Sequence, residues 1–334
     1  MKIFIILTLS LLSGTLAARS QVSVQIERVE TSKWVAHYKF ETPVNEAIFL
    51  RNSNHFRHKT WKSLTPGVQV QLGDSGELIS SIDSKKFTEV QFEVKSHYDS
   101  LVKDYEFSLP FTDKSEAMFT GHFNIYYELN GEAQYPQIDF SFLSPQENII
   151  ILGKKRFETS QWSDKSNGGT YVYFGNIEPI ETKELLSVVD PGMPEWLKER
   201  LFDFMPKLFL EYKKQTGTKL NQRPLVLFNY NPNRDGIGSG GGVLPGVVQL
   251  RVEGKGWQIE SQDLKENAVF LLAHESAHLW NSQLFSPASN ETSYWLHAGG
   301  ANVFAFRAMN NLGVIDRKRL YENYSSQLNK CIKQ

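Results

Sequence analysis

The amino-acid sequence predicts an α+β protein, in which an N-terminal β sandwich precedes a helix-rich C-terminal region. Short segments of alternating apolar and polar residues recur between residues 21 and 176, and no helical stretch separates them. This alternation places one side of each strand on a core, and many short strands in succession are typical of a sandwich. After residue 190 the apolar residues recur at helical spacing instead. We therefore expect a β-sandwich domain over 18–180 and a second domain over 181–334.

Length and composition indicate a globular protein. The chain has 334 residues, enough for two domains with their own cores. Hydrophobic residues make up 40% and charged residues 22%, a balance typical of folded proteins. The formal net charge of -1 gives no basic excess, so we expect neither nucleic acid nor an anionic membrane as a partner. Cys331 is the only cysteine, so no disulfide can form within the chain.

The first residues are typical of a secretory signal peptide, which we assign to residues 1–17. Lys2 supplies the positive charge, residues 3–12 form the apolar stretch, and Ala17 ends a small-residue cleavage site. The apolar stretch is too short for a stable membrane span. We therefore expect a secreted or periplasmic protein.

Five segments of the N-terminal region carry the alternation most clearly. In each, a period of two points one set of side chains to a core and the other set to water, which predicts half-buried strands. These segments are residues 22–26, 68–72, 90–94, 123–127 and 138–142.

Four helices and two strands are expected in the C-terminal region. The first helix is followed by Gly217, a residue typical of helix C-termini. At the start of the second helix, Asp263 and Glu266 have the spacing of a capping box. The expected helices cover residues 196–212, 264–283, 292–311 and 316–330, and the expected strands cover 224–228 and 247–252.

The most informative segment is His274-Glu275-Ser276-Ala277-His278, which has the pattern H-E-x-x-H within an expected helix. Residues four apart lie one turn apart on the same helix face, so both imidazoles can bind one metal ion. Glu275 stands beside the first histidine, where a carboxylate can accept a proton from a metal-activated water. The pattern therefore predicts His274 and His278 as metal ligands and Glu275 as the catalytic base.

The residues after this motif resemble a family of zinc enzymes. Trp280 follows the motif closely, and Trp295, Leu296 and Gly299 match the second-helix pattern W-L-x-E-G-x-A. Both features are similar to those of the gluzincin metallopeptidases, most closely the alanyl and glycyl aminopeptidases, over residues 190–313. The resemblance implies zinc as the cofactor, a peptide or protein substrate, and a truncated thermolysin-like (zincin) metallopeptidase domain.

Three positions depart from the family pattern. The third zinc ligand, a glutamate in the family's second helix, is Ala298 here. The family's Gly-x-Met-Glu-Asn strand, whose glutamate holds the substrate's amine, is replaced by residues 240–246, which include no carboxylate. The family's later tyrosine, which steadies the oxyanion, has no clear counterpart, and Tyr321 and Tyr324 are candidates by position only.

Several arrangements stay open for the metal. Glu291 can fold inward from the loop before the second helix, or His297 can replace the missing ligand. On a regular helix His297 is rotated by about 100° from Ala298 and should point elsewhere. Otherwise the two motif histidines bind zinc weakly together with water, or the chain holds no functional metal. Catalytic zinc normally has three protein ligands, so a two-histidine site should lose much of its affinity.

Residues 236–246 form a glycine-rich segment directly before the strand at 247–252. Glycine-rich loops also cradle phosphates, but here no Lys-Ser/Thr pair follows and the strand-then-helix context is missing. We interpret the segment as an edge strand, to which an extended peptide can add by backbone hydrogen bonds. Gly240, Gly241 and Gly242 are then the substrate-binding residues, and a flexible surface loop is the alternative.

Two functions are compatible with these residues. One is an exported zinc metallopeptidase that hydrolyses peptide bonds by zinc-activated water once a third ligand is recruited. The other is a catalytically impaired pseudo-peptidase that binds peptide or a protein partner through the old cleft. Ala298 favours the second function. Retention of Glu275 favours the first, because a general base has no obvious use without the metal.

Overall fold

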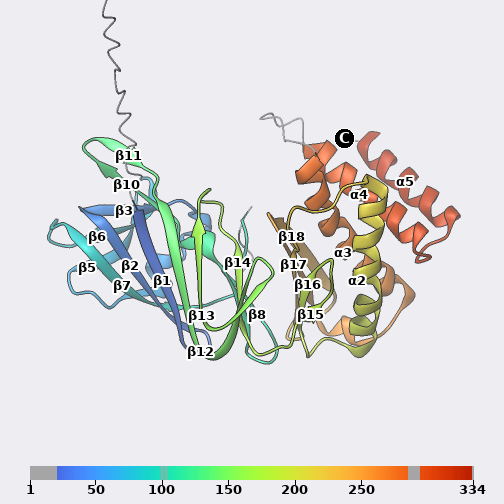
Figure 1. Ribbon diagram of the computed structural model, residues 1–334, viewed down its shortest axis with the longest axis horizontal. Helices are drawn as coiled ribbons and strands as arrows, with labels where there is room; N and C mark the ends of the chain where they lie inside the picture. Colours follow the sequence, from blue (N-terminus) through green and yellow to red (C-terminus); the bar gives the residue numbers. More distant parts are fainter. Residues whose placement is uncertain (1–20, 99–100, 102–103, 285–293, 333–334) are drawn as a thin grey trace, which may run out of the picture.

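The computed structural model describes residues 21–98, 101, 104–284 and 294–332. A sheet-rich N-terminal part is followed by a helical C-terminal part, which confirms the predicted α+β class (Figure 1). The expected signal peptide at residues 1–17 and the candidate ligand Glu291 lie outside the described residues.

The larger N-terminal sheet has the strand order β4-β7-β2-β1-β12-β14-β9-β8, with β13 paired to β12. Strands β1 and β12 run parallel, whereas β1 and β2 form an antiparallel pair. The strands are β1 (Gln21–Glu30), β2 (Lys33–Val44), β4 (Trp61–Ser63), β7 (Phe87–Lys95), β8 (Ser108–Pro110), β9 (Glu116–Phe119), β12 (Gln137–Ile151), β13 (Lys154–Asp164) and β14 (Tyr171–Gly175).

The smaller N-terminal sheet has the strand order β11-β10-β3-β6-β5. Buried side chains from both sheets meet in one core, with Trp34 and Phe92 from the larger sheet and Phe49 and Ile79 from the smaller one. The strands are β3 (Glu46–Phe49), β5 (Val68–Gly73), β6 (Gly76–Ser81), β10 (Ile125–Leu129) and β11 (Glu132–Gln134), and the short helices are η1 (Ser53–His55), α1 (Arg57–Thr60) and η2 (Thr120–Phe123).

Four of the five predicted strand segments are strands throughout, and the prediction for residues 123–127 is partly wrong. Residue Phe123 ends the helical turn η2, and the strand β10 begins only at Ile125. The carbonyl of Phe123 accepts a hydrogen bond from Tyr38 Oη at 3.1 Å, and that of His122 accepts one from Arg57. These long-range bonds stabilise the turn, and an alternation pattern in the sequence does not reveal them.

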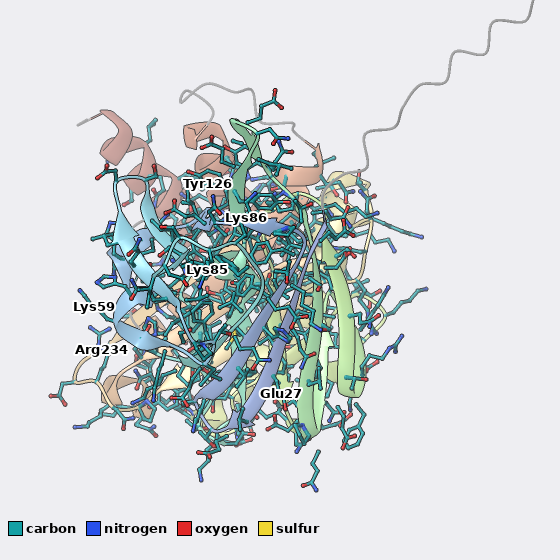
Figure 2. The ribbon with its side chains drawn as sticks, turned by 90° about the vertical axis from the view of Figure 1, so that its left-hand side faces the viewer. Glu27, Lys59, Lys85, Lys86, Tyr126 and Arg234 are labelled. Atoms are coloured by element: carbon teal, nitrogen blue, oxygen red, sulfur yellow. The ribbon has the colours of Figure 1, made fainter. Side chains whose placement is uncertain are left out.

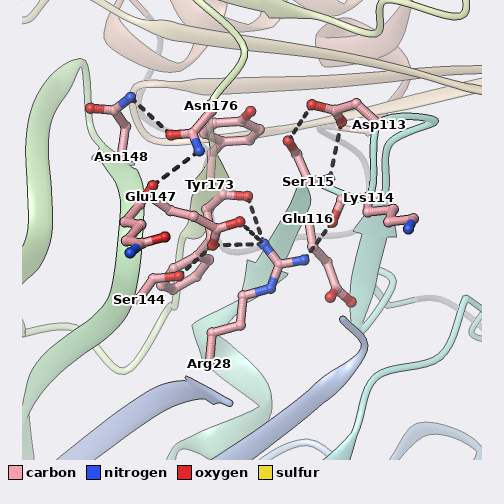
Figure 3. A network of polar contacts seen from close by, with 12 residues as sticks. Arg28, Asp113, Lys114, Ser115, Glu116, Ser144, Glu147, Asn148, Tyr173 and Asn176 are labelled. Carbon is pink, nitrogen blue, oxygen red and sulfur yellow. Dashed lines mark hydrogen bonds and ion pairs between the residues drawn. The ribbon is translucent and has the colours of Figure 1, made fainter. Parts of the chain in front are cut away.

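A buried arginine joins three segments of the larger sheet (Figure 3). Arg28 is 6% exposed and donates to the two carboxylate oxygens of Glu147 at 2.7 and 2.8 Å. It also donates to the carbonyls of Lys114 and Phe174, and Ser144 donates to the same carboxylate. Because a buried charge is tolerated only when it is paired and hydrogen-bonded, this network holds the end of β1 against β12 and β14.

Several lysines lie on the outer surface of the N-terminal part. Lys59, Lys85 and Lys86 are exposed and lie on the side of the molecule that Figure 2 presents. Aromatic residues fill the interior between the sheets instead, as with Trp34 and Phe92, which are both 0% exposed. This separation is what the period-two pattern predicts for strands with one face in a core.

A third sheet opens the C-terminal part and has the strand order β15-β16-β17-β19-β18. Its three inner strands are parallel, and each edge strand is antiparallel to its neighbour. The glycine-rich segment forms the edge strand β18, which confirms the predicted edge strand. The strands are β15 (Ile180–Glu181), β16 (Leu186–Val189), β17 (Leu225–Asn231), β18 (Gly238–Leu244) and β19 (Val247–Glu253).

The third sheet lies between the N-terminal sheets and the helices (Figure 1). Along β17, Leu225 and Leu227 pack in a cluster with residues of the N-terminal part. The alternate residues Val226 and Phe228 pack in a cluster with the helices. Both faces of the sheet are therefore covered, and the domain boundary that we expect between residues 180 and 181 stays a prediction.

The helices of the C-terminal part begin within two residues of the predicted positions. The predicted capping box of Asp263 and Glu266 is wrong, because the helix that contains them begins at Gln262. The cap is Ser261, whose Oγ accepts a hydrogen bond from Leu264 N at 3.2 Å. In the described part of the chain, no helix is long and apolar enough to cross a membrane. The elements are α2 (Glu195–Thr216), η3 (Lys255–Gln258), α3 (Gln262–Leu284), α4 (Tyr294–Asn311) and α5 (Arg317–Ile332).

Candidate metal centre

Helix α3 carries the H-E-x-x-H motif and is held in place from two sides. Its neighbour α2 supplies Tyr212, whose hydroxyl donates to the carbonyl of Ala273 at 2.6 Å. The indole nitrogen of Trp280 donates to the carbonyl of Thr218, just beyond α2, at 3.1 Å. One of these bonds precedes the motif in sequence and the other follows it. Together they fix the position of α3 along its axis and its rotation about that axis.

The two motif histidines converge on one point. The Nε2 atoms of His274 and His278 lie 3.2 Å apart, and the ring planes are nearly perpendicular at 87°. Two nitrogen ligands of one tetrahedral zinc ion, each at its usual bond length, lie about 3.3 Å apart. The residues present therefore fit two of the ligand positions of a zinc ion.

Helix α4 orients the first histidine. Nδ1 of His274 donates to Oδ1 of Asn302 at 2.9 Å, because a carbonyl oxygen can only accept. Burial lowers the pKa of His274, and the ring is neutral at pH 7, so its Nε2 carries a free lone pair. A hydrogen bond of this kind sets the tautomer and the direction of a metal-binding imidazole.

The second histidine has a different environment. Burial, together with the neighbouring His274 and His297, lowers the pKa of His278 to about 4. Within the described residues its buried Nδ1 has no hydrogen-bond partner. Since Nε2 of His274 is an acceptor, Nε2 of His278 must supply the proton for the contact between the rings.

Position 298 supplies no third ligand. Ala298 is exposed and stands one helical turn before Asn302, on the side of α4 that faces His274. Among the described residues, no group of three or more His, Cys, Asp or Glu side chains is placed to share an ion. Glu291 lies outside those residues, so its candidacy is untested.

His297 contacts the site without joining the pair. Its ring stacks on His278 with centroids 4.3 Å apart and planes 13° apart, a contact that the helix rotation alone did not predict. Its Nε2 lies 3.4 Å from Ser282 Oγ, one turn beyond His278, whereas Nε2 of His278 faces His274, one turn before. The two Nε2 atoms therefore point toward opposite ends of α3, and His297 does not share the ion position in this arrangement.

Glu275, the second residue of the motif, contacts the edge strand β18. A Cβ atom added at Gly241 of β18 would lie 2.7 Å from Glu275 Cγ, so the carboxylate side chain packs directly on the strand backbone. Burial raises the pKa of Glu275 to about 7, which is suited to a group that takes up and releases a proton near neutral pH. The structure thus places the predicted base beside the predicted substrate strand.

The other two predicted substrate residues face the opposite side of β18. A Cβ atom at Gly240 would lie 3.2 Å from Arg251 Nε, and one at Gly242 would lie 3.1 Å from Tyr105 Cε1. The three glycines therefore let side chains approach the strand closely from both faces, Glu275 on one and Tyr105 with Arg251 on the other.

A cavity of about 420 Å³ continues beyond the motif at the end of β18. Its walls include Leu279 and Ser282, which share the Glu275 face of α3, and Val243 and Leu244 of β18. Its lining combines apolar side chains with hydroxyl and amide groups, and the periodicity of the sequence did not reveal it.

Sequence reasoning missed two further residues of the site. Asn302 lies on α4, and its side-chain amide oxygen accepts from His274 Nδ1, a contact between two helices that the sequence does not reveal. Tyr105 belongs to the N-terminal part and reaches β18 across a large separation in sequence, donating to the carbonyl of Val243 at 2.7 Å. In the sequence, Tyr105 is marked only as an aromatic residue in a segment that lacks the alternating pattern of a strand.

Comparisons with known proteins identify the fold. No family model and no curated protein match the chain. The crystal structure of an aminopeptidase N family protein from Idiomarina loihiensis matches with a TM-score of 0.61 and 14% identity, over 90% of this chain and 56% of that chain. The present chain thus spans little more than half the length of that protein.

Two other structures are similar at a lower level. An M1 zinc metallopeptidase variant from Deinococcus radiodurans, bound to a Tyr-Ser-Ala substrate, matches with a TM-score of 0.45 and 9% identity, over 93% of this chain and 74% of that chain. Leukotriene A4 hydrolase from Saccharomyces cerevisiae matches with a TM-score of 0.43 and 10% identity, over 88% of this chain and 49% of that chain. The chain has the fold of the aminopeptidase N family protein.

Proposed function

We propose that this protein is a zinc-dependent metallopeptidase whose metal is held by His274 and His278. The observation that carries the proposal is the 3.2 Å separation of the two Nε2 atoms, which suits ligands of one zinc ion, beside the carboxylate of Glu275. The fold shared with an aminopeptidase N family protein supports it. With two histidines as the described ligands, we expect zinc to bind weakly.

The residues of this chain divide the chemistry among them. A bound zinc ion would supply Lewis acidity to the attacking water. Glu275 accepts the proton of that water and returns it to the amine nitrogen that leaves, as a base with a pKa near 7 can do. Gly240, Gly241 and Gly242 present a backbone edge without side chains, along which an extended peptide can lie.

We further infer the finer architecture and the location of the protein. The two N-terminal sheets correspond to the β sandwich, and the third sheet with its helices corresponds to a zincin-like domain. The signal-like residues 1–17 support export to the periplasm or the exterior.

A second candidate function is peptide binding without catalysis. The exposed Ala298 stands where the resembled families carry their third ligand, and no three-ligand group occurs in the described part of the chain. A protein of this kind would keep the β18 edge and bind a peptide or a protein partner in the same cleft.

The test combines metal content with peptide cleavage. We expect the purified protein, dialysed against dilute zinc, to retain the metal, and His274→Ala and His278→Ala to lose it. We expect cleavage of a peptide library by the wild type and none by Glu275→Gln, which keeps its zinc. The matched control is His55→Asn, because His55 is exposed at a positive φ of 44° that asparagine tolerates. Zinc that stays bound in both histidine variants would refute the assignment, and peptide binding without cleavage would select the second function.

A further inference from the structure

Among the described residues, no strand pairs with one side of the edge strand β18. β19 pairs with β18 on the other side, from Gly238 with Glu253 to Leu244 with Val247. The hydroxyl of Tyr105 donates to the carbonyl of Val243 at 2.7 Å, so that carbonyl points away from β19. Backbone groups alternate in direction along an antiparallel strand. The N–H and C=O groups of Gly241 and Ser239 therefore point to the free side as well.

Tyr105 occupies the last of these three free positions. Its hydroxyl takes the acceptor that an added strand would need at Val243, and its ring lies against Gly242, where a Cβ atom would be 3.1 Å from Tyr105 Cε1. The ring also packs on Phe119 with centroids 5.0 Å apart. An aromatic side chain fixed at both ends is an obstacle that a peptide on this edge must meet.

The backbone of Tyr105 is held by a buried polar cluster of the N-terminal part. Nε2 of His122 donates to the carbonyl of Tyr105 at 2.8 Å. His122 is fully buried, and burial together with nearby Arg57 lowers its pKa to about 3, so the ring is neutral and donates steadily. Arg57 is itself fully buried and paired with Glu77 at 2.9 Å. The position of Tyr105 is therefore part of a rigid core.

The neighbours of Tyr105 also attach to the β18–β19 hairpin. Glu106 forms an ion pair with Arg251, and the hydroxyl of Tyr98 donates to Glu253. Both partners belong to β19. Three side chains from one segment thus bind the hairpin, and Tyr105 is the one that reaches its free edge.

We propose that Tyr105 ends the peptide-binding edge of β18, so that an extended peptide pairs with Ser239 and Gly241 and stops at Val243. This inference rests on the proposed function, in which β18 is the substrate edge. Glu275 packs on Gly241, only two residues from Val243, a span of about 7 Å in a strand. Tyr105 therefore sets how many peptide residues fit on one side of the reacting position, whereas the Gly238 end leaves the other side open.

Peptide length measures this limit directly. Two series of fluorescent peptides run from dipeptide to hexapeptide. One is lengthened at the amino end and the other at the carboxyl end. Their binding to the Glu275→Gln variant is measured by fluorescence anisotropy. We expect one series to gain roughly three- to ten-fold in affinity with each residue that adds to the open side. The other series should stop gaining at the residue that reaches Tyr105.

Two variants separate the ring from the hydroxyl. Tyr105→Ala should remove the limit, so that the restricted series gains affinity with length. Tyr105→Phe should keep the limit, because the ring stays in place. The same length dependence in Glu275→Gln with and without Tyr105→Ala would overturn the inference while leaving the peptide-binding edge intact. Failure of every peptide to bind would overturn the proposed function and this inference with it.

A measurement on the unaltered chain covers the case in which Tyr105→Ala does not fold. Amide hydrogen exchange of this chain after removal of zinc by a chelator, followed by NMR with and without a saturating hexapeptide, should slow at Gly241 and Ser239 and stay unchanged at Val243. Slower exchange at Val243 would show that the peptide continues past Tyr105 and would contradict the inference.

Discussion

The Nε2 atoms of His274 and His278 face each other across 3.2 Å. Asn302 holds the first ring by its Nδ1, and the buried Nδ1 of the second ring has no partner within the described residues. His274 and His278 would hold a zinc ion through the two Nε2 atoms, and the hydrogen of each neutral ring would then stand on Nδ1. The distance between the Nε2 atoms therefore suits a shared metal ion, but only His274 has a hydrogen-bond partner at Nδ1 that would fix its orientation as a ligand.

Restoring the missing ligand should strengthen the metal site. Ala298→Glu places a carboxylate one turn before Asn302, on the side of α4 that faces His274, and we expect zinc affinity to rise roughly 100-fold or more. Isothermal titration with zinc measures the change. Val303→Glu on the same helix is the control, because Val303 is 44% exposed and the variant adds the same charge elsewhere. Equal affinities in the two variants would count against the assigned ion position.

The amide of Asn302 should matter through His274. Asn302→Ala removes the acceptor that sets the tautomer, and we expect zinc affinity to fall roughly 10- to 100-fold. Asn302→Asp keeps an acceptor at the same place and should bind zinc at least as well as the wild type. If the alanine and aspartate variants bind alike, Asn302 does not orient the ligand.

The contact between Gly241 and Glu275 should limit what position 241 can hold. The added Cβ of Gly241→Ala would lie 2.7 Å from Glu275 Cγ, so the base must shift, and a displacement of this size can lower kcat/KM roughly 100-fold. Gly238→Ala is the matched control, because its Cβ would meet Glu253 at an ordinary 3.4 Å. Cleavage of a fluorogenic peptide compares the two, and an unimpaired Gly241→Ala would place the base elsewhere.

The buried ion pair of the N-terminal part should be costly to break. Arg57 and Glu77 are each 0% exposed, so Glu77→Gln leaves an uncompensated charge, and the free energy of unfolding should fall by about 3–5 kcal/mol. Urea denaturation measures the loss. The double variant Arg57→Met/Glu77→Leu removes both charges and should recover part of it. Lys85→Met, which breaks the exposed pair with Asp83, is the control and should leave the midpoint unchanged. A loss no larger in Glu77→Gln than in the control would contradict the argument.

Local patterns in the sequence predicted the elements of the site well. The apolar spacing around His274 placed α3 within two residues of its observed start, and the glycine-rich run was placed correctly on an edge strand. The cap of α3 was misassigned to Asp263, since Ser261 gives an equally strong signal two residues earlier. Choosing between two good capping residues depends on where the chain enters the helix.

Contacts between distant segments could not be predicted in this way. The stacking of His297 on His278 depends on how α4 packs against α3, and the contact of Tyr105 with Val243 depends on how the N-terminal sheets pack against the third sheet. Periodicity assigns a residue to a face of its own element, but it carries no information about which other element covers that face.

By itself the sequence determined the class of the fold, the helix that presents two imidazoles with a carboxylate, and the lack of a ligand at position 298. These are local properties, set by the spacing of residues along one helix or strand. Only the tertiary structure decided that the imidazoles converge, that Asn302 orients one of them, and that Tyr105 closes the edge strand. Those contacts are made between elements far apart in the chain, and packing of the whole molecule determines them.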